Sequence, residues 1–293
     1  MLGEERKMAR KRWTIGVTLT LLGCQTRASV DPPREPIAAT HSVASAPSAV
    51  PADAGASGVV ALPIPARSQA AESPPSGWCG ETAIQEGLLH LGIWAPQRLV
   101  NRSGNPLHAD LYSNEIPIAL AAFGVKTTTY RGGRGYDPFA KWVRAAVDAG
   151  DPVLAGVKLV PSEHPEWGLD HFVLAVGYGP EGVLVNTTWG RREWIGRVDA
   201  KMEAAAKAQK TQRISLENAG YGIRLDGPTL PSGTTRARLT LLEEGASTMK
   251  LRVSCDPPAR AERIDVASEI TTKGGEAETS VAADRVARFA CRL

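Results

Sequence analysis

The chain has 293 residues, enough to bury a sizeable core and to form two domains. Its formal net charge is only +3, with both signs interspersed, so the composition gives no reason to expect a nucleic-acid partner. No run of about 18 apolar residues follows the N-terminal segment, so we expect that the mature chain does not span a membrane.

The first 24 residues have the pattern of an export signal. A basic stretch, KMARKRW, precedes a short apolar run, TIGVTLTLLG, of the length found in signal-peptide cores. The run ends in LLGC, which resembles the lipobox of bacterial lipoproteins. The resemblance implies cleavage before Cys24, acylation of its thiol, and a lipid-anchored protein of the cell envelope, periplasmic or at the cell surface. The alternative is an ordinary secretory signal with a chance cysteine.

Residues 25–57 are rich in alanine, proline and serine and nearly free of aromatic side chains. Such a composition cannot bury enough apolar surface to offset the entropy lost on ordering. We therefore expect a disordered tether that joins the lipid anchor to a folded part beginning near residue 58.

The first chemically informative motif is SGWCGETAIQEGLLHLG, residues 76–92. Its apolar residues recur at helical spacing, and the closing glycine is typical of a helix end. Cys79 then lies at or before the first turn, where the helix dipole and free N–H groups favour a thiolate. Such a thiolate is the nucleophile of cysteine hydrolases, and its own N–H could serve an oxyanion. The alternative is a buried structural cysteine.

The middle of the chain predicts short alternating elements. SNEIPIALAAFG indicates a helix, GVKTTTY a strand, and DPFAKWVRAAVDAG a second helix with a proline in its first turn. GDPVLAGVKLV, residues 150–160, reads as a further strand. This order of helices and strands favours an α+β fold.

The second informative motif is DHFVLAVGYGPEGVLVNTTWG, residues 170–190, which predicts two buried strands joined by a hairpin turn. His171 opens the first strand. A lone histidine at a strand end is usually structural. Here it follows a cysteine at a helix start, and an amide follows it, in the order that papain-like enzymes use.

Together these two motifs resemble the papain-like cysteine peptidase clan, and in particular the compact bacterial peptidase C39-like domains. The resemblance covers roughly residues 60–225. It implies a Cys-bearing helix packed on an antiparallel β-sheet, with Cys79 as nucleophile and His171 as the base that later protonates the leaving group. The separation of 92 residues between them is shorter than in papain and the cathepsins, which also points to the compact branch.

A third residue should accept from the imidazole and hold its orientation. In the papain pattern this is an asparagine two positions before Trp-Gly, where this chain has Thr187. Asn186 is one residue early, and a shift of one residue in a strand turns a side chain to the opposite face. Either a bulge brings Asn186 round, or Thr187 substitutes weakly, or Cys79 and His171 act as a dyad. We favour Asn186.

Two further residues correspond to positions of the resemblance. A glutamine six residues before the cysteine usually completes the oxyanion hole. The nearest candidate here is Gln69, ten residues before, so a longer loop would have to return it to the site. The alternative is a surface glutamine. Asp170 matches an acidic neighbour of the histidine and could tune His171 electrostatically.

After a break near residues 226–233, the pattern becomes alternating. MKLRVSC and ARFACRL each place a cysteine on the apolar face of a strand. We predict a small β-sandwich-like domain over residues 227–293, with four or five strands and a Cys255–Cys291 disulfide. Two reduced core cysteines are the alternative. The papain-like domain would then cover residues 58–226.

These patterns predict a lipid-anchored extracytoplasmic cysteine peptidase that cleaves a peptide or protein through an acyl-thioenzyme. One alternative keeps the fold but changes the acyl acceptor, as in an amidase, transglutaminase or acyltransferase. The other is a degenerate, non-catalytic surface-binding module. We expect no cofactor and no metal, because the remaining histidines show no ligand spacing with one another or with the cysteines.

Overall fold

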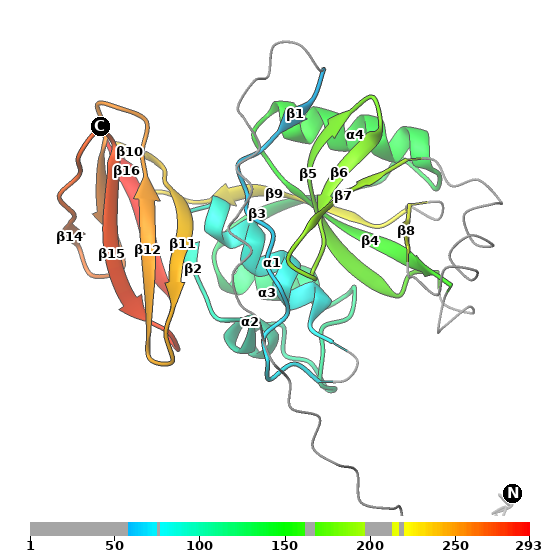
Figure 1. The fold of residues 1–293 in the computed structure, drawn as a ribbon, viewed down its shortest axis with the longest axis horizontal. Coiled ribbons are helices and arrows are strands. Elements are labelled where there is room, and N and C mark those ends of the chain that lie inside the picture. The colour runs from blue at the N-terminus through cyan, green and yellow to red at the C-terminus, as the bar shows by residue number, and fades with distance from the viewer. Residues whose placement is uncertain (1–57, 75–76, 162–167, 197–212, 217–219) are drawn as a thin grey trace, which may run out of the picture. The chain divides into compact units, whose positions relative to one another are not determined.

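The computed structural model describes residues 58–74, 77–161, 168–196, 213–216 and 220–293 (Figure 1). The expected export signal and tether therefore lie outside the described residues. Among the described residues, no helix is long and apolar enough to cross a membrane. The described ranges contain four helices: α1 (Cys79–His90), α2 (Gln97–Ser103), α3 (Ile116–Ala122) and α4 (Tyr136–Asp148).

The larger sheet has the strand order β3-β9-β4-β5-β6-β7, with β1 paired to β5 and β8 paired to β4. Each of its pairings is antiparallel. The strands are β1 (Val60–Ala61), β3 (Val125–Thr129), β4 (Val153–Val160), β5 (His171–Gly179), β6 (Gly182–Asn186), β7 (Arg192–Ile195), β8 (Arg213–Ser215) and β9 (Gly222–Pro228).

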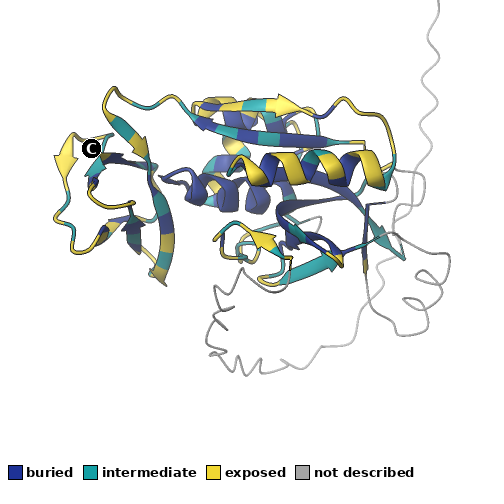
Figure 2. Cartoon of the chain, turned by 90° about the horizontal axis from the view of Figure 1, so that it is seen from above, coloured by how far each residue is buried: buried dark blue, intermediate teal, exposed yellow. Residues whose placement is uncertain are grey.

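Both faces of this sheet are buried, which explains why its central strands are almost continuously apolar. Alternate residues such as Leu174 and Leu184 face α1, α2 and α3 and form one core cluster. The intervening residues, such as Val173 and Val185, face α4 and form a second cluster. Helix α4 is accordingly buried on one side and exposed on the other (Figure 2). The fold is thus mixed helix and sheet with antiparallel strands, as the sequence predicts.

The C-terminal part contains two smaller sheets. One has the order β10-β16-β13-β14, and the other has the order β11-β12-β15. Their strands are β10 (Thr234–Arg236), β11 (Arg238–Glu244), β12 (Thr248–Ser254), β13 (Arg260–Arg263), β14 (Ser268–Glu269), β15 (Glu276–Ala282) and β16 (Ala287–Arg292). The expected count of four or five strands is too low, because β10 and β14 are very short and β15 is largely polar.

The C-terminal sheets share their core with the N-terminal half of the described chain. Strand β2 (Ile93–Trp94) pairs with β16, and Leu89 and Trp94 belong to the same buried cluster as Phe289. Gly92 makes this approach possible, since it has φ +75° and a Cβ there would lie 2.6 Å from the carbonyl oxygen of Phe289. The predicted domain boundary after residue 226 falls inside β9 and stays a prediction.

The predicted disulfide is confirmed: Cys255 and Cys291 are bonded, and both are buried in the C-terminal core. Each cysteine lies on the inward side of an alternating pattern, as the sequence indicates. Cys255 directly follows β12 and Cys291 lies in β16, so the bond joins the two small sheets covalently. Cys79 is the free cysteine of the described residues.

Loss of this bond should destabilise the C-terminal part strongly. The cysteines are 36 residues apart, and closing such a loop restricts the unfolded chain by roughly 3–4 kcal/mol. We expect the double substitution Cys255→Ala and Cys291→Ala to lower the free energy of unfolding by about this amount in urea titrations. Reduced wild-type protein is the matched control and should be equally destabilised. An unchanged midpoint in both would contradict the prediction.

Candidate active site

Cys79 is the first residue of α1, where the sequence predicts it. The preceding Trp78 is the N-cap residue, and its indole N–H donates to the carbonyl oxygen of Ala109 at 2.9 Å. The loop that contains Ala109 therefore covers one side of the helix start. The cysteine side chain is half-buried and packs against the core that α1 forms with the large sheet.

His171 is the first residue of β5, again as predicted, and its side chain is only 6% exposed. Its Nε2 lies 3.2 Å from Oγ1 of Thr188, at hydrogen-bonding distance. The ring also stacks on the indole of Trp189, with centroids 5.1 Å apart and planes 22° apart. A hydroxyl at one nitrogen and a parallel ring on one face restrain the imidazole in rotation and tilt.

A continuous path of contacts joins the cysteine to the histidine. The backbone N–H of Phe172, the residue after His171, lies close enough to the Cys79 sulfur to act toward a lower pKa of the thiol. On the other side, Gln69 accepts from the backbone N–H of Trp78 at 2.8 Å and donates to Thr188 Oγ1 at 3.2 Å. The helix start, the His171 strand and the Thr188 turn are thus held against one another. The Cys79 thiol itself is not hydrogen bonded to His171 among the described contacts.

Gln69 reaches this place because the segment before α1 is bonded to its surroundings. The backbone N–H of Gln69 donates to the Thr188 carbonyl at 3.1 Å, and that of Gly190 donates to the Arg67 carbonyl at 3.0 Å. Arg67 also donates to Gln85 in the middle of α1 at 2.7 Å. The longer loop that the sequence requires is therefore present. Its role at an oxyanion stays a prediction, because the amide is occupied at both ends.

The prediction that Asn186 orients His171 is wrong. Its side-chain nitrogen donates to the carbonyl oxygen of Ile64 at 2.9 Å, and its oxygen accepts from Arg192 at 3.1 Å. Glu86 of α1 is fully buried nearby and accepts from the backbone N–H of Arg67, and burial raises its pKa well above the ordinary range. Asn186 thus belongs to a buried structural network under the middle of α1.

Strand register explains the error. Asn186 pairs with Leu174, whose side chain faces α1, whereas His171 lies three residues away in β5 and therefore falls on the opposite face of that strand. Thr188 lies beyond the end of β6, in a turn, and there its hydroxyl reaches Nε2 of His171. The hydroxyl of the alternative residue, Thr187, instead donates to the Arg191 carbonyl at 2.8 Å. The bulge in this strand pair falls between Ala175 and Gly177 and does not reposition Asn186.

Ionisation of the Cys79 thiol is strongly disfavoured in this structure. Burial raises its pKa to about 12, and the charges of Glu81 and Asp110 add to the rise. The N–H groups of Phe172 and Gly80 offset part of the effect, as expected at a helix start. At neutral pH the cysteine is therefore a thiol, which needs a base before it can attack.

The protonation state of His171 complements that of the cysteine, because its imidazole is neutral and can accept the thiol proton. Burial lowers the pKa of its imidazole to about 4, and the negative charge of Asp170 opposes this without reversing it. The imidazole is neutral at pH 7 and can accept a proton. Asp170 is held by Lys158, 3.0 Å away, and by the backbone N–H of Leu159. Its predicted tuning effect therefore has the expected sign but is smaller than the effect of burial.

Glu81 is a charged neighbour that the sequence reasoning missed. It lies two residues after Cys79, is fully buried, and accepts from Asn101 and from the backbone N–H of Leu111 through one oxygen. Its other oxygen has no partner among the described residues. Burial raises the pKa of this carboxyl to about 7. The loop of residues 104–115 buries Glu81, and a sequence pattern does not reveal that cover.

Glu81→Gln should make Cys79 more reactive, but only where the wild-type carboxyl is ionised. Below about pH 6 the wild-type Glu81 carboxyl is protonated and neutral, as is the glutamine of the variant, so the two proteins should react alike. Above about pH 8 the wild-type charge raises the thiol pKa, so the variant should be alkylated roughly 3–10-fold faster. Rates of alkylation by iodoacetamide across this pH range provide the measurement. Equal rates at all pH values would show that Glu81 does not influence the thiol.

Thr188→Val should impair the positioning of His171. Valine keeps the shape but removes the oxygen at 3.2 Å from Nε2, so we expect about a tenfold loss in the reaction of Cys79 with a peptidyl electrophile. Thr188→Ser should retain most of the rate. The matched control is Thr187→Val, which removes a neighbouring hydroxyl that bonds to the Arg191 carbonyl and not to His171. An equal loss in both valine variants would mean that the turn, and not the hydroxyl, matters.

Comparisons with known proteins add little to this geometry. No protein-family model matches the chain, and no curated protein matches it. Among solved structures, a Bacillus anthracis protein, provisionally described as a C39-like peptidase, matches 59% of this chain and 99% of its own at 14% identity. The TM-score of that match is 0.36, and a likeness this weak carries no argument. Within the described residues, no cluster of histidine, cysteine and carboxylate side chains is arranged to hold a metal.

Proposed function

We propose that this protein is an acyl-transfer hydrolase that cleaves amide bonds of a peptide or protein, with Cys79 as nucleophile and His171 as base. One observation carries the proposal. The free cysteine begins a helix, and the backbone N–H next to the histidine lies near its sulfur, where it favours the thiolate. The histidine is in turn held at Nε2 by Thr188 and on its face by Trp189.

The protonation states suggest how the first half of the reaction runs. We assign the imidazole proton to Nε2, with Thr188 Oγ1 as its acceptor, because this tautomer leaves Nδ1 as the basic atom. As the sulfur attacks the amide carbon, the S–H proton passes to Nδ1 and the carbonyl oxygen becomes an oxyanion. The backbone N–H of Cys79 stabilises this oxyanion at the positive end of α1. Collapse of the adduct breaks the C–N bond, and the imidazolium gives its proton to the departing amine.

The second half restores the free thiol. The neutral imidazole takes a proton from water as the water oxygen attacks the thioester carbon. The C–S bond then breaks, the imidazolium returns its proton to the sulfur, and a carboxylic acid leaves. Because the thiol starts protonated, proton transfer is coupled to attack, in contrast to a preformed thiolate–imidazolium pair.

The decisive experiment is labelling of the purified protein by a peptidyl electrophile at neutral pH. Under reducing conditions, we expect labelling at Cys79 and its loss in Cys79→Ser and His171→Ala. Iodoacetamide is the control reagent, since it reports exposure of the thiol without peptide recognition. If the peptidyl probe does not label Cys79 any faster than iodoacetamide does, no peptide-binding acyl-transfer site is present.

The acyl acceptor is a separate question, because an amidase, transglutaminase or acyltransferase would use the same two residues. Mass spectrometry of reaction products separates these activities. A free carboxylic acid indicates hydrolysis, whereas a new amide formed with an added amine indicates transfer.

A second candidate, a binding module without catalysis, is favoured by the thiol itself. Its pKa of about 12 and the missing hydrogen bond to His171 describe a resting cysteine. Under this candidate, a peptide would bind with the same affinity to wild type and to Cys79→Ser, and no product would form on prolonged incubation. Burst formation of an acyl-enzyme with an activated ester would exclude it.

We further propose that the protein acts in the cell envelope, held by a lipid on Cys24, on the basis of the LLGC pattern. Metabolic labelling with a palmitate analogue tests this directly, because Cys24→Ser should lose the label and move to the soluble fraction. Retention of label in that variant would place the lipid elsewhere.

A further inference from the structure

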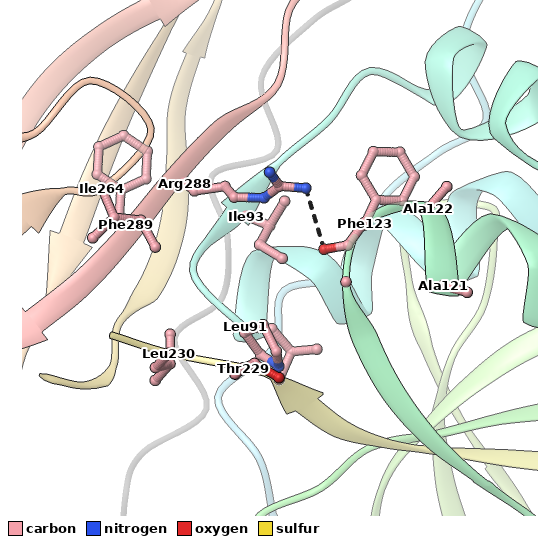
Figure 3. A pocket seen from close by; sticks show the side chains of 12 residues that line it. Leu91, Ile93, Ala121, Ala122, Phe123, Thr229, Leu230, Ile264, Arg288 and Phe289 are labelled. Atoms are coloured by element: carbon pink, nitrogen blue, oxygen red, sulfur yellow. Dashed lines mark hydrogen bonds between the residues drawn. The ribbon is translucent and has the colours of Figure 1, made fainter. Parts of the chain in front are cut away.

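A pocket of about 350 Å³ lies where the end of α1, the end of α3 and the C-terminal strand β16 meet (Figure 3). It lies beyond the C-terminal end of α1, whereas Cys79 starts that helix. Its walls are mostly apolar, with Leu91 and Ile93 from the α1–β2 segment, Leu230 after β9, and Ile264 after β13. A volume of this size falls in the range of small-molecule sites.

One charged side chain belongs to the lining. Arg288 extends from β16 toward the end of α3 and donates from Nη2 to the carbonyl oxygen of Phe123 at 3.3 Å (Figure 3). Within the described part of the chain, no carboxylate forms an ion pair with this guanidinium. The nearby carboxylate of Asp265 bonds to the backbone N–H of Arg288 and to the side chain of Arg263. Four of the five N–H donors of Arg288 thus have no described protein acceptor.

The other polar side chain of the lining is the hydroxyl of Thr229. A ligand that fills this space therefore needs an anionic group for Arg288 and an apolar remainder. A peptide is a poor match, because its amide groups would meet apolar walls without hydrogen-bond partners. A planar carboxylate suits the guanidinium well, since it can accept two parallel N–H bonds.

We propose that this pocket binds an aliphatic carboxylic acid about the size of octanoate, with its carboxylate on Arg288 and its chain between Leu91, Ile93 and Leu230. The volume corresponds to roughly ten to twelve water-sized groups, and octanoate has about ten non-hydrogen atoms. The bound chain would contact both the α-helical part and the C-terminal sheets, so binding should stabilise the packing between them. The proposal does not depend on activity at Cys79.

The experiment titrates the full chain with octanoate and measures binding by calorimetry, with octanol and octylamine as matched probes. We expect saturable binding of octanoate, weaker binding of octanol, and none of octylamine. Arg288→Gln should weaken octanoate binding at least about tenfold and leave octanol binding nearly unchanged. Octanoate should also raise the unfolding temperature of wild type in proportion to its occupancy.

Two further variants keep the proposal testable if Arg288→Gln folds poorly. Arg288→Lys retains the charge and should keep part of the affinity. Ala122→Phe adds bulk to the wall formed by α3 and should block octanoate and octanol alike. Arg285→Gln, an exposed arginine outside the lining, is the matched charge control. Equal binding of octanoate and octanol to wild type, or equal losses in Arg285→Gln and Arg288→Gln, would overturn the proposal.

Discussion

His171→Ala should lower the rate of acylation of Cys79 by about 10²–10⁴-fold, the range that a positioned general base contributes. The thiol has a pKa of about 12 and cannot ionise on its own at neutral pH. In the mechanism that we propose, the imidazole of His171, neutral because its pKa is about 4, takes this proton. Stopped-flow measurement with an activated peptide ester provides the rate.

The pH profile distinguishes this role from a structural one. In the wild type the rate should fall as the pH drops through about 4–5, because the imidazole becomes protonated and loses its basic nitrogen. His171→Ala should lack this inflection. The matched control is His90→Ala, because His90 is equally buried, bonds to the Gly150 carbonyl, and also has a pKa lowered by burial. A similar rate loss in both variants would point to a general packing defect.

Trp94→Ala should be the most destabilising single change outside the active site, costing about 3–5 kcal/mol. The indole is 2% exposed and lies in the core of the C-terminal sheets, although β2 directly follows the α1 helix. Its removal would leave a cavity at the place where the two halves join. Urea unfolding monitored by far-ultraviolet circular dichroism measures the loss.

The shared core also predicts how cooperatively Trp94→Ala unfolds. Because Leu89 and Trp94 come from the N-terminal half but pack in the C-terminal core, we expect one cooperative transition in the wild type and a loss of the C-terminal half first in Trp94→Ala. Trp94→Phe is the control, since it keeps most of the volume and loses no hydrogen bond: Nε1 has no partner among the described residues. If Trp94→Ala left the unfolding midpoint unchanged, the two halves would be independent.

Much of the fold followed from local patterns. Apolar residues at helical spacing predicted α1, and the start at Cys79 matched because Gly77 and Trp78 precede the regular run. The alternating strands of the C-terminal part predicted that Cys255 and Cys291 face one core, and the disulfide is present. Helix α2 was not predicted, because its sequence, QRLVNRS, is short and mostly polar.

The sequence alone thus determined where the two residues of the proposed chemistry lie: the cysteine at a helix start and the histidine at a strand start. Both positions depend on periodicity within a single element. The tertiary structure decided which side chain holds the histidine. Strand register kept Asn186 away from His171, the turn after β6 brought Thr188 to it, and the segment before α1 returned Gln69 to the same turn. It also buried Glu81 beside the thiol. These relations depend on contacts between residues far apart in the chain, which local spacing does not specify.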